Sequence, residues 1–304
     1  MRNIVQIIVR LTISCLIAAF VMGAVFTVTD KAKKHNEHMD LQNTMLGLLG
    51  YSKSNPAPHD LKLHAVYRYI IEDGQARYLG YMVPVDQEGK EGYQLLVVDP
   101  DGNLKKKAKV EIDPEKAIER TERDKAMAEV IGPPQSFLYA DSFIVATLGK
   151  RRLAYLLPGE FPGFKTFIRV MLALNPKFEI TGLAILEQEE DPGLGAEIVQ
   201  DYFKNQFVGK SFDKLKRLKV IKKPLPEEYR KYLERNKYKG ENFTPEQIEE
   251  IQKKYKDADI YALTGATISS KAVTSGIKNM VKKFAYRETM LERILAQEKV
   301  TAAF

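Results

Sequence analysis

Near the end of the chain lies the sequence Leu263-Thr264-Gly265-Ala266-Thr267-Ile268-Ser269-Ser270-Lys271-Ala272-Val273. A glycine between two threonines, followed by two serines and an amphipathic run, predicts a tight turn that leads into the N-terminus of a helix. Such an end collects unpaired backbone N–H groups and the positive pole of the helix dipole, so it suits a phosphate. Taken alone, these residues more often mark an ordinary capped helix start.

Thr264-Gly265-Ala266-Thr267 with Ile268-Ser269-Ser270 resembles the flavinylation motif of two related FMN-binding subunits. These are the G subunit of the Rnf electron-transport complex and the C subunit of the sodium-translocating NADH:quinone reductase. The resemblance implies that Thr267 carries FMN through a phosphoester bond installed by a separate flavin transferase. A threonine hydroxyl is a poor nucleophile without a base, and none is adjacent in the sequence, which favours modification by another enzyme. Small Gly265 and Ala266 would let the phosphate approach the backbone, and we expect Thr264, Ser269 and Ser270 to contribute to the same site.

A second motif is Glu189-Glu190-Asp191-Pro192-Gly193-Leu194-Gly195. It is similar to the Glu-Thr-Pro-Gly-Leu-Gly loop that the same family places beside the flavin ring. The resemblance implies that residues 190–195 contact the cofactor: Glu190, Asp191, Pro192, Gly193, Leu194 and Gly195. Proline fixes the entry of the loop, the glycines permit close backbone approach, and leucine offers an apolar side chain to a flat ring. Asp191 stands where the family usually has threonine, so a negative charge replaces a neutral hydroxyl.

The chain departs from the family at one more position. The family usually has an aspartate six residues before the modified threonine, where this chain has Tyr261. The nearest acid is Asp259, which fills that role if the strand carries a bulge. The segment 203–211 lacks the tryptophans that are usual in the quinone-reductase member of the family, which favours the Rnf member.

Composition limits the chemistry. The chain has 304 residues, 44% hydrophobic and 29% charged, which is typical of a globular protein. The one cysteine, Cys15, lies inside the first apolar run, so the sequence offers no thiolate cluster for iron–sulfur or zinc and no haem attachment motif. The four histidines lack a metal-binding pattern. We therefore expect an organic cofactor, no metal and no catalytic acid–base residues, since the flavin performs the redox chemistry.

The first apolar run predicts a membrane anchor. Residues 11–28 carry no charge and are long enough to span a bilayer if Arg10 reaches the interface. We expect residues 1–29 to be a transmembrane anchor in the inner membrane, followed by a stalk helix and linker over 30–58. The resemblance implies that the soluble part lies outside the cytoplasm, although the flanking lysines and arginines slightly favour the opposite orientation. A cleaved signal peptide is the alternative, because Val21-Met22-Gly23-Ala24 offers small residues.

The remainder, 59–304, is predicted to be an α+β extracytoplasmic FMN-binding domain with its core at 135–290. β-Branched and aromatic runs separated by turn residues predict an antiparallel sheet flanked by helices. The expected strands are 66–71, 78–85, 93–98, 143–147, 152–157, 167–174 and 180–187. The first three strands and the last four are weakly similar in pattern. Both a duplicated meander and two unrelated meanders are therefore compatible with the sequence. An apolar stripe predicts one long helix over 270–297.

Two charged insertions interrupt this pattern. The first, near 105–131, is expected to be a solvated surface helix that starts at Asp113-Pro114, or alternatively a basic tract that touches anionic lipid or an acidic partner. The second, near 219–257, contains a capping box, Thr244-Pro245-Glu246-Gln247, that starts a helix ending near Tyr255. Its other aromatics, Tyr229, Tyr232 and Tyr238, lie among basic residues. A net charge of only +7 argues against nucleic acid, which favours solvated helices or a docking surface.

These features predict an electron-transfer subunit of an Rnf-type ion-translocating complex that carries covalent FMN. Its expected partners are the other membrane subunits, iron–sulfur or flavin redox partners, and the transferase. The homologous quinone-reductase protein is the alternative within this class. A membrane-tethered, non-catalytic interaction module is the alternative from another class.

Overall fold

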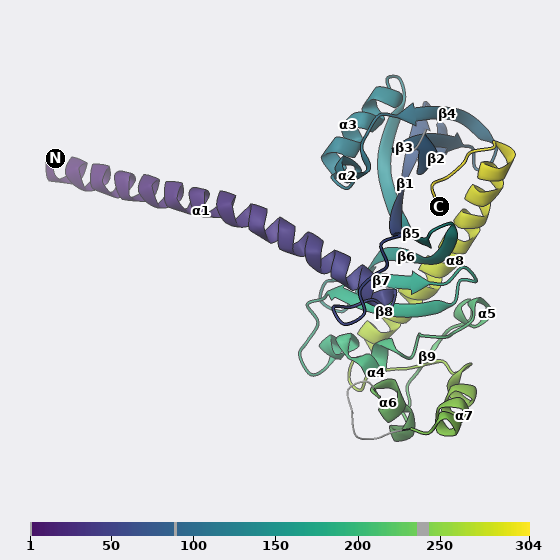
Figure 1. Cartoon of the computed structure of the whole chain (residues 1–304). Coiled ribbons are helices and arrows are strands. Elements are labelled where there is room, and N and C mark those ends of the chain that lie inside the picture. Colours follow the sequence, from purple (N-terminus) through teal and green to yellow (C-terminus); the bar gives the residue numbers. More distant parts are fainter. Residues whose placement is uncertain (1, 88–89, 236–242) are drawn as a thin grey trace.

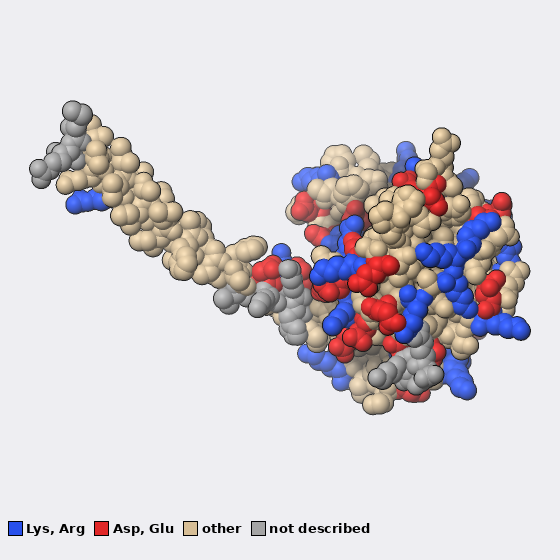
Figure 2. All heavy atoms as spheres, turned by 90° about the horizontal axis from the view of Figure 1, so that it is seen from above, with Lys and Arg blue, Asp and Glu red and all other residues tan. Residues whose placement is uncertain are grey.

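A computed structural model of the chain describes residues 2–87, 90–235 and 243–304. Helix α1 (Arg2–Leu48) projects from a globular body as one uninterrupted rod (Figure 1). Its segment Ile4–Thr27 has a mean hydropathy of 2.3 and makes no buried contacts. That segment is long and apolar enough to cross a membrane, a property that a signal sequence shares. Figure 2 shows this outer part of α1 almost free of charge, while acidic and basic side chains cover the globular body.

The rest of α1 separates the apolar segment from the body. Residues 28–48 continue the same helix, so at 1.5 Å per residue they span about 30 Å. The last turns of α1 then pack on the sheet through Leu41, Met45 and Leu48. The helix ends before Gly50, which has a positive φ of 88°.

The globular body is organised around one eight-stranded antiparallel sheet. Its order is β4-β3-β2-β1-β5-β6-β7-β8, so two four-stranded meanders join along their first strands, β1 and β5. The expected antiparallel sheet is therefore confirmed, and all seven expected strands lie within observed ones. The strands are β1 (Leu61–Asp73), β2 (Ala76–Gln87), β3 (Lys90–Val98), β4 (Leu104–Val110), β5 (Ser136–Leu148), β6 (Arg151–Pro162), β7 (Phe167–Leu174) and β8 (Ile180–Glu187).

Helix α8 (Thr267–Gln297) lies along one face of both meanders (Figure 1). Its apolar stripe shares one core with Val83 and Leu96 of the first meander and with Leu157 and Val170 of the second. Val273, Ile277 and Val281 are completely buried in this layer. Close packing requires small residues where the helix crosses β6: a Cβ on Gly276 would collide with the ring of Phe161. The expected long C-terminal helix is therefore confirmed, with a start three residues earlier than expected.

The opposite face is covered by two separate layers. Helices α2 (Pro114–Ala117) and α3 (Arg120–Val130) pack on the first meander, where Tyr69, Met82 and Met127 are fully buried. The end of α1 packs on the second meander against Leu156 and Met171. The sheet is thus buried on both sides, and α8 alone spans the whole length of one side.

The first insertion is not the single surface helix that its charge pattern predicted. The basic tract after Leu104 forms edge strand β4, in which Ala108 and Val110 face inward while the lysines face solvent. Lysines on an edge strand discourage pairing with another chain, which explains a basic run in a strand. The chain then breaks into α2, which starts at Asp113-Pro114 as expected, and α3.

The second insertion also differs from the expected solvated helices. Helices α6 (Glu227–Leu233) and α7 (Pro245–Tyr255) enclose a small aromatic core in which Tyr229, Tyr232 and Tyr255 are each less than 10% exposed. The rings of Tyr229 and Tyr255 stack with centroids 4.1 Å apart. The capping box at Thr244 is present. Tyr238 lies outside the described residues.

The remaining elements link β8 to α8. They are the 3-10 helix η1 (Gly195–Val199), α4 (Asp201–Lys204), α5 (Phe212–Leu215), and a small parallel sheet of β9 (Val220–Ile221) and β10 (Ile260–Tyr261). Strand β10 leads directly into the threonine motif.

Candidate functional site

The threonine motif forms a β-turn that opens helix α8. The N–H of Ala266 donates to the carbonyl of Leu263 at 3.1 Å, and Gly265 has a φ of 74°, which favours glycine at that position. The Ser270 hydroxyl accepts from the N–H of Leu263 at 3.0 Å and donates to the carbonyl of Ala266 at 2.9 Å. Ser270 therefore fixes both sides of the turn from inside the helix.

Thr267 is the first residue of α8. Its neighbour Ala266 is the N-cap and provides no side-chain cap. The first N–H groups of a helix have no acceptor within the helix, and here no side chain at the N-cap takes that place. Thr267 is half-buried, while Thr264 lies exposed in the turn. Both hydroxyls are therefore near the positive end of α8, but only Thr267 belongs to the helix.

Glu190 joins three segments that are far apart in the sequence. Its side chain is only 5% exposed. One carboxylate oxygen accepts the N–H groups of Phe164 at 2.8 Å and Lys165 at 3.2 Å, and the other accepts the hydroxyl of Ser269. One buried carboxylate thus ties the β6–β7 turn and the start of α8 to the glycine loop at 190–195.

The glycine loop lies directly against the threonine turn. A Cβ on Gly265 would lie 2.7 Å from Cδ2 of Leu194, so the leucine side chain reaches the turn. A Cβ on Gly195 would lie 2.7 Å from both the Ser269 hydroxyl oxygen and a Glu190 carboxylate oxygen. Glycine is therefore required at 195 for the loop to approach α8. The structure brings together the two motifs that the sequence singled out.

Asp191 has a partner that the sequence did not indicate. Its carboxylate lies 2.5 Å from the ammonium group of Lys165. Hydrogen bonding and charge attraction from Asp191 raise the pKa of Lys165, so this lysine is charged at neutral pH. The ammonium group of Lys165 therefore compensates the negative charge of Asp191, the residue that replaces the family's usual threonine.

The β6–β7 turn supplies the residues that the sequence reasoning missed. Gly163, Phe164 and Lys165 lie against Glu190 and Asp191, more than twenty residues upstream of them in the sequence. No local pattern links these segments, so only the tertiary structure identifies them. Phe164 is 58% exposed, and two apolar side chains of the motifs are also exposed: Leu194 at 44% and Ile268 at 56%. Leu194 contacts the threonine turn at Gly265, and Ile268 follows Thr267 directly in α8. Exposed apolar side chains of this kind suit a planar ring.

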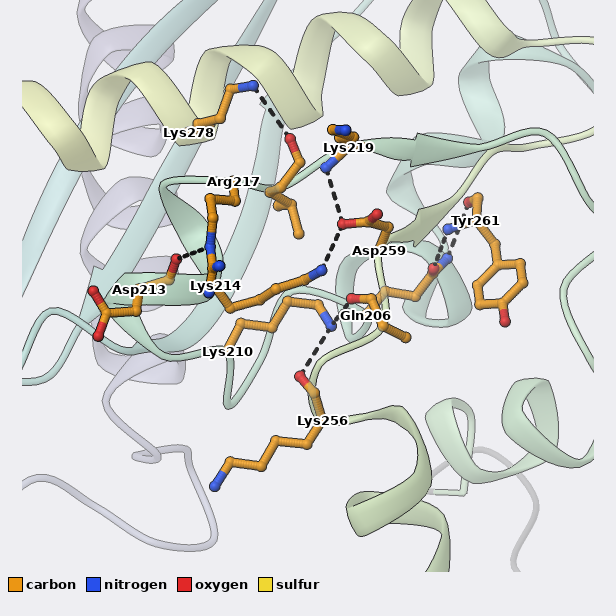
Figure 3. A network of polar contacts seen from close by, with 12 residues as sticks. Gln206, Lys210, Asp213, Lys214, Arg217, Lys219, Lys256, Asp259, Tyr261 and Lys278 are labelled. Carbon is orange, nitrogen blue, oxygen red and sulfur yellow. Dashed lines mark hydrogen bonds and ion pairs between the residues drawn. The ribbon is translucent and has the colours of Figure 1, made fainter.

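Asp259, the acid nearest to the position where the family usually has aspartate, is bonded to neighbouring groups of the fold. Its carboxylate accepts the Lys214 ammonium at 2.7 Å and the backbone N–H of Lys219 at 3.1 Å (Figure 3). The two-residue pairing of β10 with β9 is regular, with Ile260 opposite Val220 and Tyr261 opposite Ile221. The expected bulge is therefore absent from this described pairing, and Asp259 acts within the fold.

Comparisons with known proteins identify a domain that includes these residues. Residues 163–282 match the model of the FMN-binding domain. The matched segment therefore begins at the β6–β7 turn, includes the glycine loop and the threonine turn, and ends within α8.

Two curated relatives are each 30% identical to the chain. The G subunit of the proton-translocating ferredoxin:NAD(+) oxidoreductase complex of Clostridium ljungdahlii aligns over 138 residues, 45% of this chain and 57% of the relative. The G subunit of the Na(+)-translocating ferredoxin:NAD(+) oxidoreductase complex of Acetobacterium woodii aligns over 126 residues, 41% of this chain and 46% of the relative. The chain thus spans about half the length of these curated relatives.

Two solved structures are also similar. The C subunit of the Na(+)-translocating NADH-quinone reductase of Parabacteroides distasonis has a TM-score of 0.33 at 20% identity, covering 62% of this chain and 74% of that chain. NqrC of Shewanella oneidensis has a TM-score of 0.44 at 15% identity, covering 86% of this chain and 99% of that chain. From the domain match and the two curated relatives it follows that residues 163–282 form an FMN-binding domain, and that this part of the chain is homologous to the G subunits of ferredoxin:NAD(+) oxidoreductase complexes.

Proposed function

We propose that the chain is the electron-carrying subunit of an Rnf-type ion-translocating oxidoreductase and holds FMN covalently on Thr267. The observation that carries the proposal is the contact between the two motifs: Leu194 lies on Gly265, and Glu190 binds Ser269. Two segments about seventy residues apart in the sequence thus form one exposed site around a threonine at a helix N-terminus.

The residues present fit FMN. A phosphate on the Thr267 hydroxyl would be at the N-terminus of α8, which has no side-chain cap and where N–H groups and the helix dipole stabilise an anion. Gly265 leaves room beside the backbone, and Leu194 and Ile268 offer exposed apolar surface for the ring. Bound FMN would supply reversible electron transfer. Lys165, held by Asp191, is the cation beside the site that can tune the potential.

Attachment requires a transferase and an activated donor. The Thr267 hydroxyl gives up its proton and forms the new phosphorus–oxygen bond, while the phosphoanhydride bond of a flavin adenine dinucleotide breaks and adenosine monophosphate leaves. The protein supplies an accessible hydroxyl in a turn made of small residues, and the transferase supplies the base that activates it.

The test is whether the flavin survives denaturation. The full-length chain, co-expressed with a flavin transferase and separated on a denaturing gel, is expected to show flavin fluorescence at its own mass, because only a covalent link persists there. The chain expressed without a transferase is the control and should be dark. A dark band in both samples, with the transferase active on a known acceptor, would contradict the proposal and favour a non-catalytic interaction module.

We also propose that α1 is retained as a single-pass anchor in the inner membrane, with the FMN-binding domain on the extracytoplasmic side. Its apolar segment Ile4–Thr27 is exposed along its whole length and is followed by about 20 Å of helix, residues 28–40, before α1 packs on the domain. Partner proteins that exchange electrons with the site must therefore reach well above the membrane surface.

A reporter fusion tests this orientation. Alkaline phosphatase, which folds only outside the cytoplasm, is expected to be active when fused after Phe304 and to remain with the membrane fraction. A fluorescent protein that matures only in the cytoplasm should be dark at the same position. Bright cytoplasmic fluorescence would reverse the orientation, and active phosphatase in the soluble fraction would indicate a cleaved signal peptide.

A further inference from the structure

Strand β10 positions the threonine turn, but it is so short that its pairing with β9 gives it little stability. It has only two residues, and its ladder to β9 consists of the N–H of Ile260 bonded to the carbonyl of Lys219 at 3.0 Å and the N–H of Ala262 bonded to the carbonyl of Ile221 at 2.9 Å. Leu263, the first residue of the threonine turn, comes two residues after β10. A shift of β10 would therefore move the attachment site.

A buried glutamine pairs with the other edge of β10. Gln206 is 1% exposed, and its side-chain amide accepts the N–H of Tyr261 at 2.8 Å and donates to the carbonyl of Tyr261 at 3.3 Å (Figure 3). The amide thus makes the two hydrogen bonds that a neighbouring strand would make. No backbone group of Tyr261 is left unpaired.

Two lysines hold the residues that precede β10. The Lys214 ammonium donates to Asp259 at 2.7 Å, and the Lys210 ammonium donates to the carbonyl of Ala258 at 2.7 Å. Lys210 is only 2% exposed. Burial, followed by the nearby charge of Lys214, lowers the pKa of Lys210 to about 8. A lysine buried in this way is retained where its hydrogen bonds to the backbone are needed.

The side chain of Tyr261 connects β10 to the second insertion. Its ring lies edge-on to the ring of Tyr229 on α6, with centroids 6.4 Å apart at 66°. Tyr229 in turn stacks on Tyr255 of α7. The residue six positions before Thr267 is therefore part of the aromatic core of α6 and α7, in a chain that lacks the aspartate usual in its relatives.

We propose that five residues fix β10 in place and so position Thr267 for flavin attachment: Gln206, Lys210, Lys214, Asp259 and Tyr229. We call this set the clamp. It contacts β10 mainly at Tyr261, through the backbone and the ring of that residue. The second insertion thereby acts as a positioning element for the modification site. The proposal rests on the proposed function, since it concerns attachment of FMN to Thr267.

The experiment measures the initial rate of covalent FMN incorporation into the purified full-length chain in detergent, with flavin transferase and saturating FAD. Lys214→Gln is expected to lower the rate about ten-fold, because small displacements of a reacting group cost about that much or more. Lys214→Arg keeps the cation and should restore most of the rate. The matched control is Lys216→Gln at the residue directly after α5, which removes an exposed pair with Asp213 of that helix and should leave the rate unchanged.

Two substitutions of Tyr261 test the clamp from the side of β10, by the same rate of FMN incorporation. Tyr261→Phe keeps the ring on Tyr229 and should stay within about two-fold of the unaltered chain, whereas Tyr261→Asp should lose at least about ten-fold. Near-ultraviolet circular dichroism checks that each variant is folded, and amide exchange at Ile260 and Ala262 should be faster in Lys214→Gln. If Tyr261→Asp takes up FMN as fast as or faster than the unaltered chain, the aspartate is preferred for recognition and the clamp is refuted.

Two other results would refute either the clamp or the proposed function. Equal rates for Lys214→Gln and Lys216→Gln overturn the clamp, and they do so even if Tyr261→Asp does not fold. Failure of the unaltered chain to take up FMN contradicts the proposed function itself, which separates that failure from failure of the clamp.

Discussion

Replacing Thr267 by valine is expected to abolish covalent FMN completely. Valine keeps the β-branched shape but has no hydroxyl, so no phosphoester can form. Thr267 is half-buried at the first position of α8, where loss of a hydroxyl should cost less than about 1 kcal/mol in the free energy of unfolding. Intact mass spectrometry of the chain co-expressed with a transferase should show the FMN adduct in the unaltered chain and none in Thr267→Val.

Thr264→Ser is the matched control. Thr264 lies on the strand side of Gly265 in the same turn, so composition alone does not choose between the two threonines. We expect position to choose, because Thr267 is the first residue of α8, whose first N–H groups can stabilise a phosphate, whereas Thr264 precedes the helix. Thr264→Ser should retain the adduct. Peptide mapping that places FMN on Thr264, or an adduct that persists in Thr267→Val, would falsify the assignment.

The sheet was predictable because its strands carry their own signals. The runs at 167–174 and 180–187 coincide with β7 and β8, since turn residues bound them on both sides and both faces are buried. The strand order across β1 and β5 was not predictable. In the pairing of β1 with β5, Leu61 lies opposite Leu148, and no local pattern encodes a contact across so many residues.

In both insertions the many charged residues led to a wrong prediction of solvated helices. Lysines at 105, 106, 107 and 109 follow no apolar period, but pairing with β3 makes them an edge strand. In α6, the basic neighbours of Tyr229 and Tyr232 suggested a solvated surface, although the two rings are buried against α7. Tertiary packing overrides local composition in both cases, because burial of a few large rings outweighs weak local preferences.

The site was predictable in its motifs and not in the contacts that assemble it. The motifs at 190–195 and 264–270 were identified separately, and the structure places them side by side. The partner of Asp191 is Lys165, and the donors to Glu190 are the N–H groups of Phe164 and Lys165. These contacts are made by a turn with no motif of its own, so the sequence could not indicate them.

Glu190→Ala is expected to be the most destabilising single change at the site. It removes the one acceptor of two backbone N–H groups and of the Ser269 hydroxyl in a buried position. Hydrogen bonds to a charged group contribute about 1.5–3 kcal/mol each, and leaving several buried donors unpaired should cost about 3–5 kcal/mol in total. For a domain of this size that corresponds to a thermal midpoint lower by roughly 10 °C. Thermal unfolding of the full-length chain in detergent, followed by near-ultraviolet circular dichroism, measures the loss.

Two variants separate the carboxylate's contacts from its charge. Glu190→Gln keeps one oxygen for the N–H groups of Phe164 and Lys165, and its amide can donate to the Ser269 hydroxyl, which then acts as an acceptor. It should therefore cost only about 1–2 kcal/mol, chiefly through the lost interaction with the positive end of α8. Glu189→Ala changes the exposed neighbour and should stay within about 0.5 kcal/mol of the unaltered chain. Equal midpoints for Glu190→Ala and Glu189→Ala would mean that the carboxylate does not join the three segments.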